Sequence, residues 1–262
     1  MNKIRLTIWN ETSDYKKAAQ TVQAVFPQEY HALVLNMLKE AESVYPKGIH
    51  NAIADLFKDS KDVDIKISLL DDDEQGLSEE VLQNTDVLIY WGHFFHDFVP
   101  LEAAERVADH VQRGMGAIFL HSAHISRPFK RLMGTSGSLK WREKNEKERI
   151  FVATPSHPIA EGLDEYFELE EEEMYSEPFG IPKPDDTVFI SWFKGGEVFR
   201  SGVTFVRDYG KIFYFRPGHE TNRSFYDENV KKVLNNAVRW ARPVKRHDKL
   251  DSPYSKEIER LD

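Results

Sequence analysis

The chain of 262 residues contains no cysteine. This absence excludes disulfide bonds, thiolate metal ligands and a cysteine nucleophile. The chain has 10 histidines, so their positions along the sequence are informative about a site.

The sequence also lacks an apolar run near the roughly 20 residues that a membrane helix needs. Its beginning, MNKIRLTIWN, enters a strand-like pattern without the apolar region of a signal peptide. Basic residues are in the minority, with 35 Lys and Arg against 44 Asp and Glu, and the net charge is −9. Such a chain is poorly suited to bind nucleic acid or an anionic membrane. We therefore expect a cytoplasmic protein whose partner is a small molecule.

The first half of the chain alternates short apolar segments with helix-like sequence. Residues at helical spacing separate the segments, most clearly over 101–113, where Gly114 is a natural stop. Later, Ser126 can cap a short helix that Gly134 can end. This alternation predicts an α/β fold with a doubly wound, mostly parallel sheet. The predicted strands are 4–9, 63–70, 86–92 and 117–120.

The second half has strand-like segments that follow one another directly, which predicts additional antiparallel strands. A final helix is expected over about 227–240. No linker rich in Pro, Gly or Ser divides the chain, so we expect one domain over 1–244 and a charged C-terminal tail over 245–262. The predicted strands here are 167–175, 187–193, 197–206 and 211–215.

The helical region after the first strand contains a near-repeat. The stretch VFPQEYHALVLNML from Val25 aligns with VYPKGIHNAIADLF from Val44. Two copies are too few for a solenoid, which needs at least three. A local duplication and a coincidence are the remaining interpretations.

Polar residues collect where the predicted strands end. Ligands of an open α/β sheet bind beyond the carboxyl ends of its strands, so these positions are candidates for a functional site. A hydrogen-bonded structural histidine is the competing interpretation at each single position. The polar residues at these ends are Asn10, Glu11, His93, His121, Ser122, His124, His219 and Glu220.

The acidic stretch FELEEEEMY adds two candidates. If Phe167 and Leu169 face the core, strand alternation places Glu173 and Tyr175 on the same face. An inward glutamate needs a partner, although the whole acidic run could instead be solvated. Trp141, in a polar stretch that we predict to be a loop, could stack on a sugar ring, anchor a subunit contact or lie buried.

Several stretches together resemble the trehalose-utilisation (ThuA-like) proteins over most of the chain. The resemblance implies the class I glutamine-amidotransferase-like fold, with a flavodoxin-like sheet, and a role in sugar metabolism. The family pattern matches at His121, His157, Glu173, Tyr175 and His219, and the turn-forming sequence around His157 suggests a structural role there. The first near-repeat copy has no clear family counterpart and resembles an insertion. The matching stretches are IWNE, YPKGIH, DVLIYWGH, LHSAH, LMGTSGSLKWRE, HPIAEGL, EEEEMY, ISWFKGGEVFRSG and KIFYFRPGHET.

Relatives in the wider fold carry a catalytic cysteine on a sharp turn between a strand and a helix. That position falls on His121 here, so amidotransferase chemistry through a thiolate is excluded. Ser122 is a weaker nucleophile candidate, because LHSAH lacks the flanking glycines of G-x-S-x-G.

The leading hypothesis is a trehalose- or disaccharide-utilisation enzyme that acts on a sugar or keto-sugar, as a hydrolase, lyase or isomerase. His121, Glu173 and His219 would perform acid/base chemistry. Glu220 and Tyr175 complete the predicted catalytic set. The predicted substrate-binding residues are Asn10, Glu11, Ser122 and Trp141.

A second hypothesis adds a divalent metal, most naturally zinc. His93, His121, His124 and His219 would supply nitrogen ligands, with Glu173 or Glu220 as an oxygen ligand. An alternative from another class is a non-catalytic protein that senses sugar or binds a partner. We also expect a homo-oligomer, because symmetric assembly is common among soluble enzymes.

Overall fold

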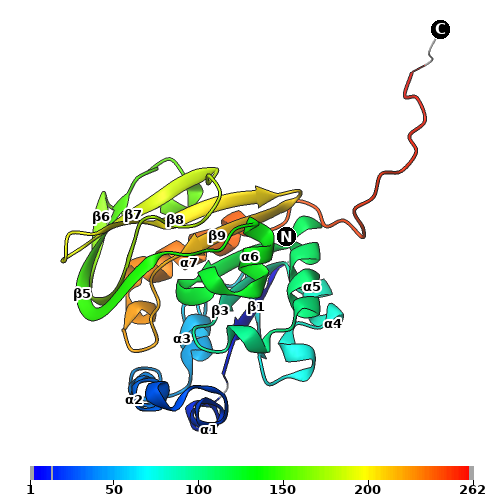
Figure 1. The fold of residues 1–262 in the computed structure, drawn as a ribbon. Helices are drawn as coiled ribbons and strands as arrows, with labels where there is room; N and C mark the ends of the chain where they lie inside the picture. Colours follow the sequence, from blue (N-terminus) through cyan, green and yellow to red (C-terminus); the bar gives the residue numbers. More distant parts are fainter. Residues whose placement is uncertain (1–2, 13, 260–262) are drawn as a thin grey trace.

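The computed structural model describes residues 3–12 and 14–259 (Figure 1). Within these residues, all the strands belong to one nine-stranded sheet of order β2-β1-β3-β4-β9-β8-β7-β5-β6. The strands are β1 (Ile4–Asn10), β2 (Val63–Leu69), β3 (Val87–Trp91), β4 (Gly116–Leu120), β5 (Lys140–Val152), β6 (Tyr166–Ser176), β7 (Asp186–Phe193), β8 (Val198–Arg207) and β9 (Gly210–Phe215).

Helices connect the strands of the first half and close the chain. The helices are α1 (Tyr15–Val25), α2 (Gln28–Val44), α3 (Ile49–Asp55), α4 (Glu79–Gln83), α5 (Leu101–Gln112), α6 (Arg127–Met133) and α7 (Glu228–Ala241). Short 3₁₀ turns are η1 (Asp73–Gly76), η2 (His96–Phe98), η3 (His121–Ile125), η4 (Pro158–Ala160) and η5 (Ser224–Tyr226). None of the helices in the described residues is long and apolar enough to cross a membrane.

The sheet has a parallel half and an antiparallel half. Strands β2, β1, β3, β4 and β9 run parallel, in an order that matches a flavodoxin-like sheet with β9 as its fifth strand. From β9 onward, β8, β7, β5 and β6 pair antiparallel. The predicted fold class is therefore confirmed, including the additional antiparallel strands in the second half.

The prediction of a loop around Trp141 was wrong, because SLKWREKNEKER contributes most of β5. Its charged side chains form ion pairs: Arg142 pairs with Glu146 of the same strand and with Glu197 in the turn before β8, and Arg149 pairs with Glu168 of the neighbouring β6. Cross-strand ion pairs on a solvated sheet face stabilise a strand without the apolar alternation that predicts one.

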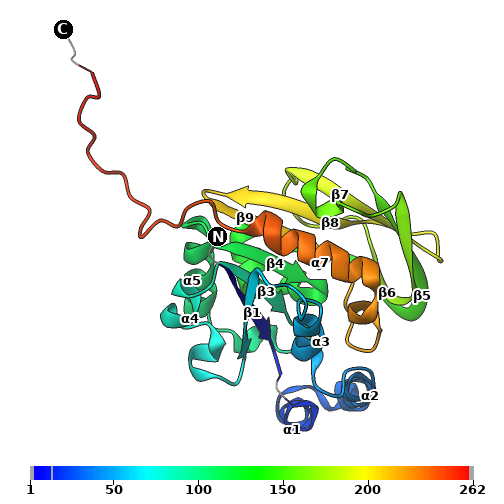
Figure 2. The ribbon, with the colours of Figure 1, turned by 180° about the vertical axis from the view of Figure 1, so that it is seen from behind.

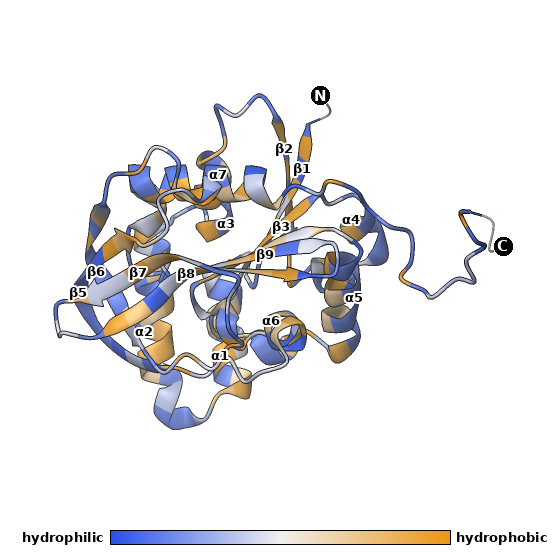
Figure 3. Cartoon of the chain, turned by 90° about the horizontal axis from the view of Figure 1, so that it is seen from above, coloured by the Kyte–Doolittle hydropathy of each residue, from blue (hydrophilic) through white to orange (hydrophobic). Residues whose placement is uncertain are grey.

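Helices cover both faces of the parallel half (Figures 2 and 3). On one face, Ile53 of α3 and Leu234 of α7 pack with strand residues such as Ile8. On the other face, Val107 of α5 and Phe129 of α6 pack against β3 and β4. The residues of β3 and β4 are all buried, as expected for parallel strands covered on both sides.

Helices α1 and α2 form a separate hairpin beyond the carboxyl end of β1 (Figure 1). A small apolar cluster holds this hairpin together and attaches it to Phe95 in the loop after β3. The two near-repeat copies therefore have different surroundings: the first forms α2 in the hairpin, and the second forms α3 in the main core.

The predicted tail begins against the domain and then leads away from it. Arg246 donates a hydrogen bond to the Thr85 carbonyl, and the His247 ring stacks on Tyr209 with 3.8 Å between ring centroids. Beyond these contacts, the C-terminal segment runs clear of the domain in both ribbon views (Figures 1 and 2).

Candidate functional site

His121 stands on a sharp turn between β4 and η3. Its φ of 51° lies in the left-handed region, which costs a residue other than glycine on the order of 1 kcal/mol. The Nδ1 atom contacts the Arg216 carbonyl at 3.1 Å, and the ring stacks on Tyr175 with 5.1 Å between centroids. Ser126 then caps α6, and Gly134 ends it in the left-handed conformation, as predicted. The strand–turn–helix geometry implied for the cysteine position is thus present, with an imidazole in place of the thiol.

Three histidines and one glutamate meet beside this turn. His93, His121, Glu173 and His219 each offer one ligand atom, and these atoms lie within 4.8 Å of one another. They come from the loop after β3, the end of β4, strand β6 and the loop after β9. We call these four residues the histidine cluster. The prediction that Glu173 points inward is confirmed, because its side chain is buried in this cluster.

Each imidazole of the histidine cluster is held through its Nδ1 atom. His93 Nδ1 lies 2.8 Å from both carboxylate oxygens of Glu220. His121 Nδ1 donates to a carbonyl, and His219 Nδ1 contacts Thr221, at 2.9 Å from the hydroxyl and 3.3 Å from the backbone N–H. These outer contacts leave the Nε2 atoms for the centre of the cluster.

The centre of the cluster contains polar atoms without hydrogen-bond partners. His219 Nε2 and Glu173 Oε2 are both buried and make no hydrogen bond among the described residues. Glu173 Oε2 lies 3.1 Å from His121 Nε2 and 4.0 Å from His219 Nε2, without hydrogen-bond geometry. Buried polar atoms are normally satisfied, so this arrangement needs an explanation.

The electrostatic environment shifts the pKa values of His93 and His121 in opposite directions. Burial alone would lower the pKa of His93, but the Glu220 carboxylate raises that pKa to about 9. Burial, together with His219 and His93, holds the pKa of His121 well below its usual range. Burial opposes ionisation of Glu220, yet His219 and His93 lower its pKa overall.

Beneath the cluster lies a buried arginine that the sequence analysis did not select. The Arg216 guanidinium donates to the Glu173 carbonyl at 2.9 Å and to Glu172 Oε2 at 3.0 Å, and it pairs with Glu148. All three charged side chains of this triad are fully buried. An arginine that directly follows the apolar strand sequence IFYF was the available signal for it.

A cavity of about 390 Å³ opens onto the histidine cluster, which is within the usual range of ligand pockets. His93, Glu173 and Tyr175 reach its wall, and the Ser122 hydroxyl lies 2.8 Å from the Tyr175 hydroxyl. Trp141 also lines the cavity and pairs in register with Tyr175 across β5 and β6, with its side chain 63% exposed. These predicted site residues are therefore brought together.

Further residues of the cavity were missed by the sequence analysis. Glu143 lies on its wall, with Oε1 at 3.8 Å from His219 Nε2, and burial raises its pKa. Leu33, Val34 and Met37 of α2 form another part of the wall. Their helical spacing indicates only an apolar helix face and carries no signal for a pocket.

His124 borders the cavity but is not one of the four clustered residues. Its Nδ1 donates to the Gly137 carbonyl at 2.7 Å, and burial lowers its pKa to about 4. His157 accepts a hydrogen bond from the Ile159 N–H and packs against Trp240, which agrees with a structural role.

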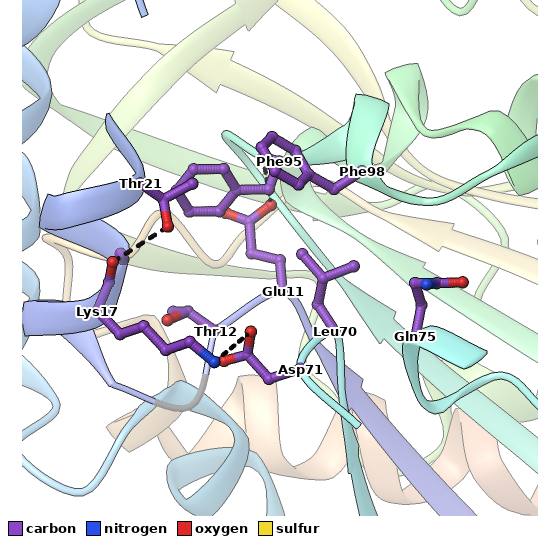
Figure 4. A pocket seen from close by; sticks show the side chains of 10 residues that line it. Glu11, Thr12, Lys17, Thr21, Leu70, Asp71, Gln75, Phe95 and Phe98 are labelled. Carbon is purple, nitrogen blue, oxygen red and sulfur yellow. Dashed lines mark hydrogen bonds and ion pairs between the residues drawn. The ribbon is translucent and has the colours of Figure 1, made fainter. Parts of the chain in front are cut away.

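Asn10 and Glu11 lie away from the cavity that faces the histidines. Asn10 Nδ2 lies 2.9 Å from His50 Nδ1, and Glu11 accepts hydrogen bonds from the backbone of Phe94 and Phe95. Glu11 lines a second cavity of about 160 Å³, across which Lys17 pairs with Asp71 at 2.9 Å (Figure 4). In this structure Glu11 therefore fixes the loop that carries His93.

The fold and the site define a class: a cysteine-free α/β protein with a histidine–carboxylate cluster at the carboxyl edge of a flavodoxin-like sheet. The sequence model of the ThuA family, described as trehalose utilisation, matches residues 5–241. The chain belongs to this family. No curated protein matches the sequence significantly.

Solved structures resemble the chain at low sequence identity. A putative ThuA-like protein from Parabacteroides merdae is 16% identical, with a TM-score of 0.60 over 95% of this chain and 93% of that one. A cytoplasmic protein from Salmonella typhimurium LT2 is 11% identical, with a TM-score of 0.59 over 91% and 100% of the two chains. A β-galactosidase from Bacillus circulans sp. alkalophilus is 11% identical, with a TM-score of 0.52, and the match covers 93% of this chain but 32% of that enzyme. These likenesses show the fold.

Proposed function

We propose that the chain is a cytoplasmic enzyme of trehalose or related glycoside utilisation whose histidine cluster holds a divalent cation. One observation carries this proposal. Three imidazoles, each fixed through Nδ1, converge with Glu173 Oε2 at the wall of a cavity, and within the described part of the chain His219 Nε2 and Glu173 Oε2 have no hydrogen-bond partner.

The donor set fits such a cation. Imidazole nitrogens and a carboxylate oxygen suit zinc and neighbouring divalent transition metals. Outer partners such as Glu220 on His93 and the Arg216 carbonyl on His121 are the kind that orient metal-binding histidines. When bound, the cation would supply a Lewis acid that polarises an oxygen of the sugar.

Other groups of the chain then act on the substrate. Glu143 has a carboxylate on the cavity wall and could exchange a proton with a sugar hydroxyl. The paired hydroxyls of Ser122 and Tyr175 could orient the sugar by hydrogen bonds. The exposed indole of Trp141 offers a face on which a sugar ring can stack.

A mechanism without metal is the competing form of the same proposal. His121 Nε2 and Glu173 Oε2 are 3.1 Å apart, close enough to share a proton during acid/base catalysis. The metal content of the protein distinguishes the two forms, because a cation would occupy both atoms.

The first experiment is metal analysis of protein purified without added ions and without a histidine tag. We expect about one divalent ion per chain in the wild type and almost none in His219→Asn. His124→Asn is the matched control, because this histidine borders the cavity outside the cluster, and it should keep the ion. Wild-type protein with a metal content near zero would overturn the metal-binding form.

The second experiment separates an enzyme from a sensor. Trehalose and related glycosides are incubated with the wild type and with Glu143→Gln, and the products are analysed. We expect turnover by the wild type and a loss of about 10²–10⁴-fold in Glu143→Gln, as is usual when a group for proton transfer is removed. Tight binding of a sugar without any product would favour a sensor.

A further inference from the structure

Helix α2 gives the cavity a wall that differs in chemistry from the histidine cluster. Leu33, Val34 and Met37 are the residues of α2 that line it, and none of them has a side-chain donor or a strong acceptor for a hydrogen bond. Val34 is buried in the contact with α1, whereas Leu33 remains 54% exposed. The packing of the hairpin therefore leaves part of this apolar surface exposed.

Two more exposed apolar side chains line the same cavity. Ile125, at the end of η3, is 38% exposed, and Trp141, near the start of β5, is 63% exposed. Together with Leu33 they leave apolar surface in contact with water at one place, which is typical of a binding site. The ionisable groups of the cavity, by contrast, belong to or adjoin the histidine cluster.

We infer that the cavity binds a glycoside whose group next to the reacting sugar is apolar, an alkyl or aryl aglycone held against α2. This inference rests on the proposed function, since it takes the histidine cluster as the place where the sugar reacts. The sugar hydroxyls find partners in Ser122, Glu143 and Tyr175. The aglycone packs against Leu33 and Met37.

A second sugar ring in the place of the aglycone fits this wall poorly. Its hydroxyls would leave water and meet side chains with no donor and no strong acceptor, which is unfavourable. An alkyl group instead gains from burial, by about fourfold in affinity for each methylene that leaves water. The wall thus selects glycosides with an apolar aglycone over a disaccharide such as trehalose.

The test is calorimetric titration of methyl, butyl and hexyl glucosides, in both anomers and below micelle-forming concentrations, with trehalose for comparison. In the wild type we expect affinity to rise about fourfold per methylene until the alkyl chain fills the cavity, and trehalose to bind more weakly than hexyl glucoside. Leu33→Gln should flatten this dependence on chain length. Val25→Gln is the matched control, because Val25 is 51% exposed in the same hairpin but does not line the cavity.

Three results would overturn the inference: no dependence on chain length, no binding of any glucoside, or a dependence that Leu33→Gln leaves unchanged. Product analysis on the same glucosides separates this inference from the proposed function. Binding that strengthens with chain length but yields no product supports the apolar subsite and contradicts the enzyme. Turnover of glucosides at rates and affinities independent of chain length supports the enzyme and contradicts the subsite.

Discussion

Arg216 illustrates how much a single buried charge determines at this site. Its guanidinium lies between Glu148 and Glu172, and it also holds the backbone of Glu173. Burial raises the pKa of Glu148 in spite of the arginine beside it. The position of the Glu173 carboxylate therefore depends on a charge that contacts no substrate.

Replacing Arg216 by methionine should destabilise the protein by about 3–5 kcal/mol, because two carboxylates would stay buried without their cation. Urea unfolding of the two proteins at neutral pH measures this difference. Glu148→Gln combined with Arg216→Met removes one of the uncompensated charges and should recover part of the loss. A loss below about 1 kcal/mol in the single variant would contradict a structural role for the triad.

His124 allows a second prediction at the residue scale, about pH. Its pKa of about 4 in the folded protein lies below the usual value for histidine, so the unfolded chain binds a proton first as the pH falls. The wild type should therefore lose about 2–3 kcal/mol of stability from this residue between pH 7 and pH 4.5.

The measurement is unfolding at both pH values for the wild type and for His124→Asn, whose amide can still donate to the Gly137 carbonyl. The variant lacks the ionisable ring. Between the two pH values, its stability should therefore fall by about 2–3 kcal/mol less than the stability of the wild type. Equal losses in the two proteins would show that His124 does not contribute to the pH dependence.

At the scale of elements, helix α6 ends at Gly134 because this residue adopts the left-handed backbone conformation. Gly134 has a φ of 67°, and a Cβ added there would meet nothing within 4 Å. Gly134→Ala should therefore cost about 1–2 kcal/mol, entirely from the left-handed backbone. Gly134→Asn should cost less, since asparagine tolerates this conformation better. Thermal unfolding measures both variants, and an alanine variant as stable as the wild type would refute this account.

Elements of the parallel half could be predicted from sequence, and β5 could not. Strands β3 and β4 are covered on both faces, so each is a continuous apolar run. In β5 only Glu148 and Ile150 are buried, and charged partners on β6 and in the turn before β8 replace apolar neighbours. A strand stabilised by side chains distant in sequence carries little local signal.

Only part of the candidate site could be predicted from the sequence. The topology rule identifies the strand ends that carry His93, His121 and His219. It does not say which polar side chains turn toward one another, so Glu11 and His124 seemed equivalent to the others. Glu143 and α2 join the cavity only through tertiary packing, which the sequence does not show locally.

For the whole molecule, the histidine cluster connects distant parts of the sheet. Its histidines follow β3, β4 and β9 in the parallel half, and its glutamate lies on β6 at the antiparallel edge. These positions span residues 93–219, so the unfolded chain does not present them together. A cation bound by all four residues would therefore bind the folded state and stabilise it as a unit.

Removing the cation should accordingly lower the melting temperature. At a free concentration of 100 times Kd, a bound ion contributes about 2.7 kcal/mol, which for a chain of this size is a shift of several degrees. Wild-type protein would be melted before and after treatment with a chelator, and again after zinc is returned. We expect a decrease and a recovery in the wild type and in His124→Asn, and neither in His219→Asn, which lacks one ligand of the cluster. Wild-type protein whose melting temperature responds neither to chelator nor to zinc would contradict a cation bound by the histidine cluster.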